Sequence, residues 1–429
     1  MQKLLRSTGH FMAMACAVLA LHAAAAETVA PERLGLAPER LQRIDELVQR
    51  SIDAGDISGA VTLVARNGQI AHLQAHGVMD IASKKLMQPD TIFRIASMSK
   101  PVAAVAILML VEEGKVRLND PVSKFIPAFG ELQVAIAKPR APSGPGGAAA
   151  PTAPGGFGGP PPEFYTVPAD RAITVLDLLT HTSGVMSGPM SNSAGQAASA
   201  KRHDLGLAWV EGAAAAPLEF QPGSRWAYSA LTGFDVLSRI VEIASGQSFD
   251  AFLAARVFQP LGMQDVFFWP NAAQRARLVT SYQRSETGLT PSANPDSMSG
   301  AKYFSGAGGL MTTAESYAQF AMMLANGGEL NGKRLLSPRT VELMGAAYVP
   351  DTLPGRPDGE GYGLGVRVVV NPVARGTWLS EGSFGWSGLY GTHFWVDPKE
   401  NLVGILMAQT SSRALLADFE NAVMQALVE

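Results

Sequence analysis

Residues 92–113 read IFRIASMSKPVAAVAILMLVEE, and this stretch decides how the chain is interpreted. The first four residues have the apolar, β-branched character of a short strand, and the remainder is a long apolar run that predicts a helix. Pro101 falls in the first turn of that helix, where its missing N–H costs little, and Gly114 is placed to end it. The sequence therefore predicts a strand that leads directly into a helix opening at Ser97.

Ser97 and Lys100 form an S-x-x-K motif at the start of this helix. Residues three apart on a helix share one face, so the lysine amine can reach the serine hydroxyl. An amine kept neutral by burial or nearby positive charge can act as a base toward that hydroxyl. The free N–H groups of the helix N-terminus can help to bind an oxyanion. Alternatively, Ser97 is only a helix N-cap.

A second S-x-x-K match, Ser299 to Lys302, lies in a Ser/Gly/Pro-rich stretch with no predicted helix after it.

Tyr228, in the stretch Trp226-Ala227-Tyr228-Ser229-Ala230, precedes a predicted helix at 235–244. A tyrosine hydroxyl beside a lysine ammonium is drawn toward phenolate and can serve as a general base. The alternative for this tyrosine is a core aromatic.

Hydrophobic periodicity predicts strands near both ends of the chain and helices between them. Asn67-Gly68 predicts a hairpin between two of the strands. The predicted strands are 60–65, 70–75, 366–370, 392–396 and 402–407, and the predicted helices are 41–54, 97–113, 175–179, 235–244, 314–325 and 414–427. This order predicts an α+β fold in which an antiparallel sheet, built from both ends and flanked by helices, carries an inserted helical lobe.

Taken in order, Ser97-x-x-Lys100, Tyr228-Ser229 and Gly385-Trp386-Ser387-Gly388 resemble the motifs of the class C β-lactamase-like serine hydrolases. That family includes β-lactamases, D-amino-acid peptidases, penicillin-binding proteins and carboxylesterases. Further resemblances are His181-Thr182-Ser183-Gly184, Pro260-Leu261-Gly262-Met263 and Ser305-Gly306-Ala307-Gly308-Gly309-Leu310. The resemblance covers a single domain from residue 33 to residue 428, interrupted by a Pro/Gly-rich insertion at 138–162 that we expect to be disordered.

The resemblance implies a two-lobed β-lactamase/transpeptidase-like fold with the site between the lobes. It implies that Ser97 is the nucleophile and that Lys100 and Tyr228 manage its proton. It further implies that the backbone N–H groups of Ser97 and Leu389 form the oxyanion hole, and that Gly388-Leu389 lies on the strand lining the site. No cofactor and no metal are expected, and the partner is a small ester or amide substrate rather than nucleic acid.

This chain departs from the family pattern at two places. Ala230 replaces the asparagine of a Tyr-x-Asn motif, which removes an amide that can hold the lysine. Trp386-Ser387-Gly388 replaces Lys-Thr-Gly and resembles the Trp-Gly-Gly of the carboxylesterase branch. An aromatic side chain in place of a cation favours a neutral, partly apolar group in the site. We therefore expect hydrolysis of short-chain carboxylic esters through an acyl-enzyme.

Several alternatives remain open at this stage. β-Lactam or D-amino-acid peptide hydrolysis, acyl transfer to an alcohol, and non-catalytic binding of a β-lactam or cell-wall fragment would use the same residues. A Ser-His-Asp hydrolase is less favoured because no G-x-S-x-G occurs. His393, close to the third motif, is the histidine that we expect to line the cleft. His72 and His76 lack the H-E-x-x-H pattern of a helical zinc site.

The first 26 residues have the pattern of a secretory signal peptide: basic residues, an apolar run and Ala24-Ala25-Ala26 before Glu27. An uncleaved membrane anchor is the alternative, although the apolar run is short for a span. The only cysteine, Cys16, lies within this leader, so the mature chain has neither a disulfide nor a thiolate nucleophile. We expect an exported protein, periplasmic or secreted, of net charge −3 and without a basic stripe for nucleic acid.

Overall fold

The structure is a computed structural model that describes residues 28–139 and 161–429. The predicted signal peptide, 1–26, lies outside the described residues, as does most of the predicted insertion at 138–162. In the part of the chain that is described, none of the helices is both long enough and apolar enough to cross a membrane.

The insertion leaves and rejoins the fold at one place. The strands on either side of it, β5 (Gln133–Ala137) and β6 (Phe164–Pro168), pair in antiparallel register. Beyond their ends, the N–H of Lys138 donates a hydrogen bond of 2.8 Å to the carbonyl of Glu163. The two flanks are therefore adjacent strands of one hairpin, which the sequence did not predict.

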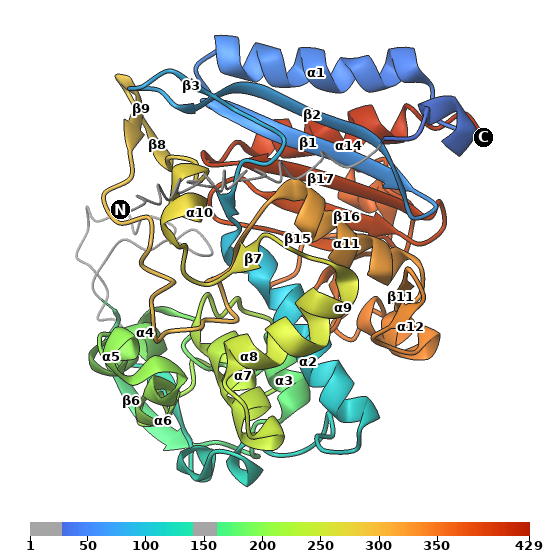
Figure 1. The fold of residues 1–429 in the computed structure, drawn as a ribbon. Coiled ribbons are helices and arrows are strands. Elements are labelled where there is room, and N and C mark those ends of the chain that lie inside the picture. The colour runs from blue at the N-terminus through green and yellow to red at the C-terminus, as the bar shows by residue number, and fades with distance from the viewer. Residues whose placement is uncertain (1–27, 140–160) are drawn as a thin grey trace, which may run out of the picture.

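The main sheet of the described chain joins strands from both ends of the sequence. Figure 1 shows the blue N-terminal strands beside the red C-terminal strands. In spatial order the strands are β13 (Glu360–Tyr362), β14 (Arg367–Val369), β15 (Phe384–Ser387), β16 (His393–Asp397), β17 (Leu402–Ala408), β1 (Gly59–Arg66), β2 (Gln69–Asp80) and β3 (Lys85–Leu86). All neighbours are antiparallel. The predicted antiparallel sheet is therefore confirmed.

Smaller sheets surround this one. They are formed by β4 (Phe93–Arg94), β10 (Met311–Thr312) and β7 (Val266–Phe267), by β8 (Tyr282–Ser285) and β9 (Gly288–Pro291), and by β11 (Glu329–Leu330) and β12 (Lys333–Arg334). The predicted hairpin between β1 and β2 is confirmed: Asn67 and Gly68 have φ of 54° and 73°. A two-residue turn with two positive φ angles matches the twist of the strands that it joins.

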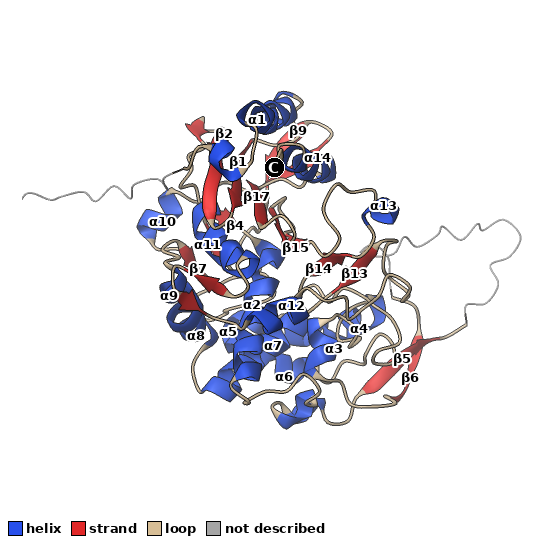
Figure 2. Cartoon of the chain, turned by 90° about the vertical axis from the view of Figure 1, so that its right-hand side faces the viewer, coloured by secondary structure: helices blue, strands red, loops and turns tan. Residues whose placement is uncertain are grey.

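Helices cover both faces of the main sheet and form the second lobe (Figure 2). The helices are α1 (Pro38–Asp53), α2 (Ser99–Glu112), α3 (Val175–Leu179), α4 (Pro189–Ser199), α5 (Arg202–Leu205), α6 (Trp209–Ala213), α7 (Thr232–Ser245), α8 (Phe249–Leu253), α9 (Gln259–Leu261), α10 (Ala272–Ala276), α11 (Ala314–Ala325), α12 (Pro338–Met344), α13 (Pro372–Arg375) and α14 (Arg413–Met424). One face packs on α1 and α14 through a cluster that includes Leu47, Trp395 and Phe419. The other packs on α2 and α11.

The helix α2 joins the two lobes. Its residues from Ser99 to Leu110 are all buried, which explains why its sequence is apolar all round rather than on one face. Its partners include α7 of the helical lobe, and its apolar side chains belong to the same buried cluster as Phe394 and Val396 of the sheet. The N-terminus of α2 therefore lies at the junction of the lobes, where the predicted nucleophile is placed.

Candidate active site

Ser97 lies in a short turn between a strand and the central helix. Strand β4 leads into the 3-10 turn η2 (Ala96–Met98), and the α-helix begins at Ser99, two residues later than predicted. Ala96 has φ 44°, in the left-handed region that a residue with a Cβ seldom adopts. Ser97 is half-buried, whereas Ala96 and Met98 are fully buried. The strained backbone thus presents the serine at the surface of the junction.

Lys100 is completely buried one turn along the helix, and its exposed fraction is 0%. Its Nζ donates hydrogen bonds to the Oγ of Ser97 at 3.2 Å and to the carbonyls of Ala230 at 2.7 Å and Ala307 at 2.8 Å. Nζ also lies 4.8 Å from the centre of the Tyr228 ring. The backbone of Ala230 therefore holds the lysine at the place where relatives carry an asparagine side chain.

Tyr228 approaches the serine from the other lobe. Its hydroxyl donates a hydrogen bond of 2.6 Å to the Oγ of Ser97, across 131 residues of sequence. The serine oxygen thus receives two hydrogen bonds, one from Tyr228 and one from Lys100. The structure brings together all three residues that we predicted to be catalytic, within hydrogen-bonding distance of one oxygen. This is the geometry that proton transfer to or from the serine needs.

The third motif borders the same site. Strand β15 ends at Ser387, so Gly388 and Leu389 lie in the turn toward β16. The prediction that these two residues lie on the strand is therefore wrong. The chain leaves the strand there because Gly388 approaches the segment before the nucleophile: a Cβ on it would lie 2.3 Å from the carbonyl oxygen of Ile95. The absence of a side chain at Gly388 is what allows this contact.

Two backbone N–H groups near the serine have no hydrogen-bond partner within the described residues: those of Ser97 and Leu389. The N–H of Gly388, which precedes Leu389 in the chain, is already bonded to the carbonyl of Thr392 at 2.7 Å. Unpaired N–H groups at a site are available to an anionic oxygen. This arrangement fits the oxyanion hole that the resemblance implies.

Aromatic rings form one wall of the site. The Trp386 ring lies 5.5 Å from the ring of Tyr228 and 5.2 Å from that of Tyr362, and Trp226 lies 5.7 Å from Tyr362. We call these four residues the aromatic wall. Arg356 packs 4.3 Å over Trp226, but its side chain is 1% exposed and paired with Glu360. Neither Tyr362 nor Arg356 belongs to a sequence motif, so neither was predicted to lie at the site.

Ser387 and His393 face each other across β15 and β16. The Oγ of Ser387 lies 2.8 Å from Nδ1 of His393, and Nε2 of the same ring lies 2.9 Å from Glu420 of α14. Burial raises the pKa of Glu420, but the hydrogen bond and charge of His393 and the charge of Arg367 outweigh it and lower this pKa to about 2. His393 is 1% exposed and connects Ser387 to Glu420 through its two ring nitrogens. Glu420 was not predicted.

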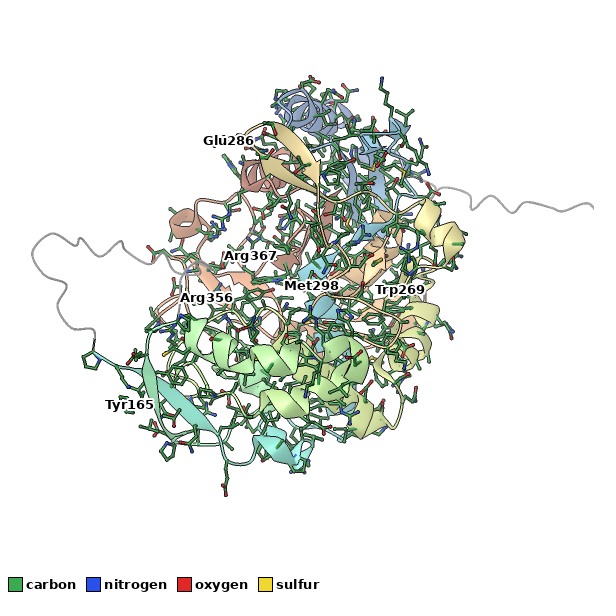
Figure 3. The ribbon with its side chains drawn as sticks, turned by 90° about the vertical axis from the view of Figure 1, so that its left-hand side faces the viewer. Tyr165, Trp269, Glu286, Met298, Arg356 and Arg367 are labelled. Atoms are coloured by element: carbon green, nitrogen blue, oxygen red, sulfur yellow. The ribbon has the colours of Figure 1, made fainter. Side chains whose placement is uncertain are left out.

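Met298 also lies close to the turn that carries Ser97. A Cβ on Gly308 would be 2.7 Å from its sulfur and 3.7 Å from the carbonyl carbon of Ala96. In Figure 3, Met298, Arg356 and Arg367 lie at the level where the sheet lobe meets the helical lobe. The segment that carries Met298 therefore borders the site. In the sequence this segment stood out only because the second S-x-x-K match, Ser299 to Lys302, follows Met298.

The other candidates from the sequence lie elsewhere. Ser299 is buried, Lys302 is exposed, and no helix follows them. On β2, His72 bonds to Thr62 at 2.8 Å, and His76 contacts Asp45 of α1 at 3.0 Å. Across residues 28–139 and 161–429, no group of three or more His, Cys, Asp or Glu side chains could hold a metal ion.

Comparison with known proteins identifies the family. The model of the Beta-lactamase family matches residues 44–428. The chain belongs to the β-lactamase family. An uncharacterised protein of Mycobacterium tuberculosis is 33% identical over 379 residues, covering 84% of this chain and 88% of the relative. Esterase EstB of Burkholderia gladioli is 28% identical over 408 residues, covering 90% of this chain and 94% of the relative.

Solved structures agree with this assignment. EstCE1, described as a hydrolase with promiscuous acyltransferase activity, is 26% identical, with a TM-score of 0.73 over 90% of this chain and 99% of its own. The predicted family and the β-lactamase/transpeptidase-like fold are therefore confirmed. The family and its esterase-named members support a hydrolase of the serine type.

Proposed function

We propose that this protein hydrolyses short-chain carboxylic esters through an acyl-enzyme formed on Ser97. The observation that carries the proposal is the pair of hydrogen bonds to one oxygen, from Lys100 at 3.2 Å and from Tyr228 at 2.6 Å. A serine hydroxyl is a weak nucleophile unless a neighbouring base takes its proton. Here two such neighbours, held by different lobes, meet at the serine.

In the first half of the reaction the Oγ of Ser97 attacks the ester carbonyl carbon, and its proton passes to the Tyr228–Lys100 pair, which enters this step one proton short of its fully protonated form. The carbonyl oxygen becomes an oxyanion, which the N–H groups of Ser97 and Leu389 are free to bind. The tetrahedral intermediate then expels the alkoxide, which takes the proton back and leaves as the alcohol. The acyl group remains bonded to Ser97.

In the second half, water attacks the acyl carbon and gives one proton to the same pair. The oxyanion forms again at the same N–H groups, and collapse expels the oxygen of Ser97. The serine recovers its proton and the carboxylic acid is released. Water is the acceptor in this scheme; an alcohol in its place would yield a new ester.

The surroundings of Ser97 favour a neutral substrate. Trp386 stands where β-lactamases of the family carry a lysine, and it packs against Tyr228. Arg356, which lies behind Trp226, is 1% exposed and bonded to Glu360, so it is not free to meet a substrate carboxylate. Leu389 adds an apolar side chain at the rim, with 67% of its surface exposed. An apolar lining with few polar groups suits an ester better than a charged β-lactam.

The experiment compares the purified protein with Ser97→Ala on p-nitrophenyl esters of two to eight carbons and on a chromogenic cephalosporin. Ser299→Ala, in the second S-x-x-K match, is the control. We expect ester turnover that falls by orders of magnitude in Ser97→Ala and is unchanged in Ser299→Ala. Retained activity in Ser97→Ala would exclude Ser97 as nucleophile. Faster cephalosporin than ester hydrolysis would refute the substrate class while leaving the nucleophile in place.

A further inference from the structure

His181 contacts the chain on both sides of Tyr228. Its carbonyl oxygen accepts the N–H of Ala227 at 3.1 Å, and its ring Nδ1 accepts the N–H of Ser229 at 3.2 Å. The two residues that flank Tyr228 in sequence are therefore both bonded to His181. The rings of His181 and Tyr228 lie 4.8 Å apart. A single residue thus constrains the backbone before and after the tyrosine as well as its ring.

These contacts define the form of the histidine. Because Nδ1 accepts a backbone N–H, it cannot carry a proton, so the ring proton is on Nε2. The ring is 1% exposed. Burial, and then the positive charges of Lys100 and Arg356, lower the pKa of His181 well below its ordinary value. His181 is therefore neutral at physiological pH and serves as an acceptor rather than as an acid or base.

His181 is itself held by a rigid element. It follows α3, and its N–H donates to the carbonyl of Leu178 at 3.3 Å, while Thr182 donates to the carbonyl of Asp177 at 2.9 Å. Asp177 caps the same helix through Thr174. The φ angle of His181 is 57°, so its ring points away from the helix path and toward Tyr228. The capped helix α3 of the second lobe therefore fixes His181, and His181 in turn fixes the position of Tyr228.

We propose that His181 is a positioning residue that keeps the hydroxyl of Tyr228 within hydrogen-bonding distance of Ser97. The proposal rests on the proposed function, since it concerns the same proton transfer. The 2.6 Å bond joins two lobes, and the backbone on both sides of Tyr228 sets where the tyrosine ring enters the site. Loss of the Nδ1 acceptor frees the N–H of Ser229 and lets that segment move. A misplacement of about 1 Å at reacting groups costs about a hundredfold in rate.

The matched pair of variants is His181→Asn and His181→Leu. Asparagine tolerates the left-handed conformation better than most residues and keeps an acceptor oxygen near the place of Nδ1. Leucine is similar in size to asparagine but offers no acceptor. We expect His181→Leu to lower kcat for p-nitrophenyl acetate by about 10- to 100-fold with KM little changed, and His181→Asn to stay within about threefold of the parent.

His181→Gly covers the case in which leucine prevents folding, because glycine adopts φ 57° without strain. It lacks the acceptor and is expected to lose activity like His181→Leu. Each variant is also combined with Tyr228→Phe. If His181 acts through the tyrosine hydroxyl, its substitution adds little to the loss already caused by Tyr228→Phe; a purely structural effect would add in full.

The outcomes separate the two proposals. Activity retained in His181→Leu or His181→Gly, an equal loss in His181→Asn, or full additivity with Tyr228→Phe overturns the positioning role. In that case turnover that still requires Ser97 leaves the proposed function intact. Turnover that is independent of Ser97 refutes the proposed function itself, and the positioning role with it.

Discussion

Removing one oxygen atom from Tyr228 tests how Ser97 is activated. In Tyr228→Phe the ring stays, together with its packing on His181, Trp386 and Lys100. The hydroxyl makes one hydrogen bond to protein in the described structure, the 2.6 Å bond to Ser97. The substitution therefore removes a contact to the nucleophile and little else.

The expected losses in stability and in rate differ greatly in size. One hydrogen bond contributes about 0.5–1.5 kcal/mol to folding. Because Tyr228 is half-buried, we expect the free energy of unfolding of the variant to lie within about 1 kcal/mol of that of the parent. A positioned acid–base group contributes about 10²- to 10⁴-fold to rate, or about 3–5 kcal/mol of barrier. The fall in kcat should thus greatly exceed the change in stability.

The measurement is kcat and KM for p-nitrophenyl acetate, with urea unfolding of the same preparations. Tyr362→Phe is the matched control, because Tyr362 belongs to the same aromatic wall and its buried hydroxyl has no hydrogen-bond partner within the described residues. It should keep kcat within about threefold of the parent, since it removes no group aligned with the nucleophile. If Tyr228→Phe kept more than a tenth of the parent kcat, proton transfer through Tyr228 would be refuted and Lys100 would have to serve alone.

Two further predictions concern the third motif and its support. Gly388→Ala places a Cβ 2.3 Å from the carbonyl oxygen of Ile95, so the turn must shift. We expect kcat to fall at least about tenfold, because the adjacent N–H of Leu389 moves with the turn. A kcat equal to that of the parent would contradict this role of the turn. Glu420→Gln should destabilise the protein by about 3 kcal/mol at pH 7, since the pKa falls from 4.5 to about 2 on folding. A lowered folded-state pKa gives stability that is present above pH 4.5 and lost as the pH falls toward 2. Urea unfolding should therefore show the parent–variant difference shrinking between pH 6 and pH 3, and a constant difference would refute the assignment to this carboxylate.

The local part of the site could be predicted because it depends on helix geometry. Ser97 and Lys100 are three residues apart, and an apolar helix places them on one face whatever the rest of the fold does. The run that follows Lys100 is apolar all round and predicted a helix, but only the structure shows that this helix, with Lys100, is buried on all sides. The strand-like apolar runs near both ends of the chain likewise predicted a sheet to which both ends contribute.

The motif order indicated Tyr228, but only through resemblance to a family. Nothing in Trp226-Ala227-Tyr228 distinguishes a general base from a core aromatic. What the structure adds is a hydrogen bond from the Tyr228 hydroxyl to the Oγ of Ser97, between residues 131 positions apart. The same holds for His181. Its His-Thr-Ser-Gly motif could be recognised in the sequence, but its hydrogen bonds to Ala227 and Ser229 are seen only in the tertiary structure.

By itself, the sequence determined the fold class through hydrophobic periodicity and the Ser97–Lys100 pair through spacing along one element. The family resemblance rested on motifs spread along the chain, not on either of these. Tertiary structure alone decided the partners of that pair: the carbonyls of Ala230 and Ala307 on the lysine and the hydroxyl of Tyr228 on the serine. It likewise decided the support of Ser387 through Glu420. Such contacts join residues far apart in sequence, and their distances are set by how sheet and helices pack, which no local pattern encodes.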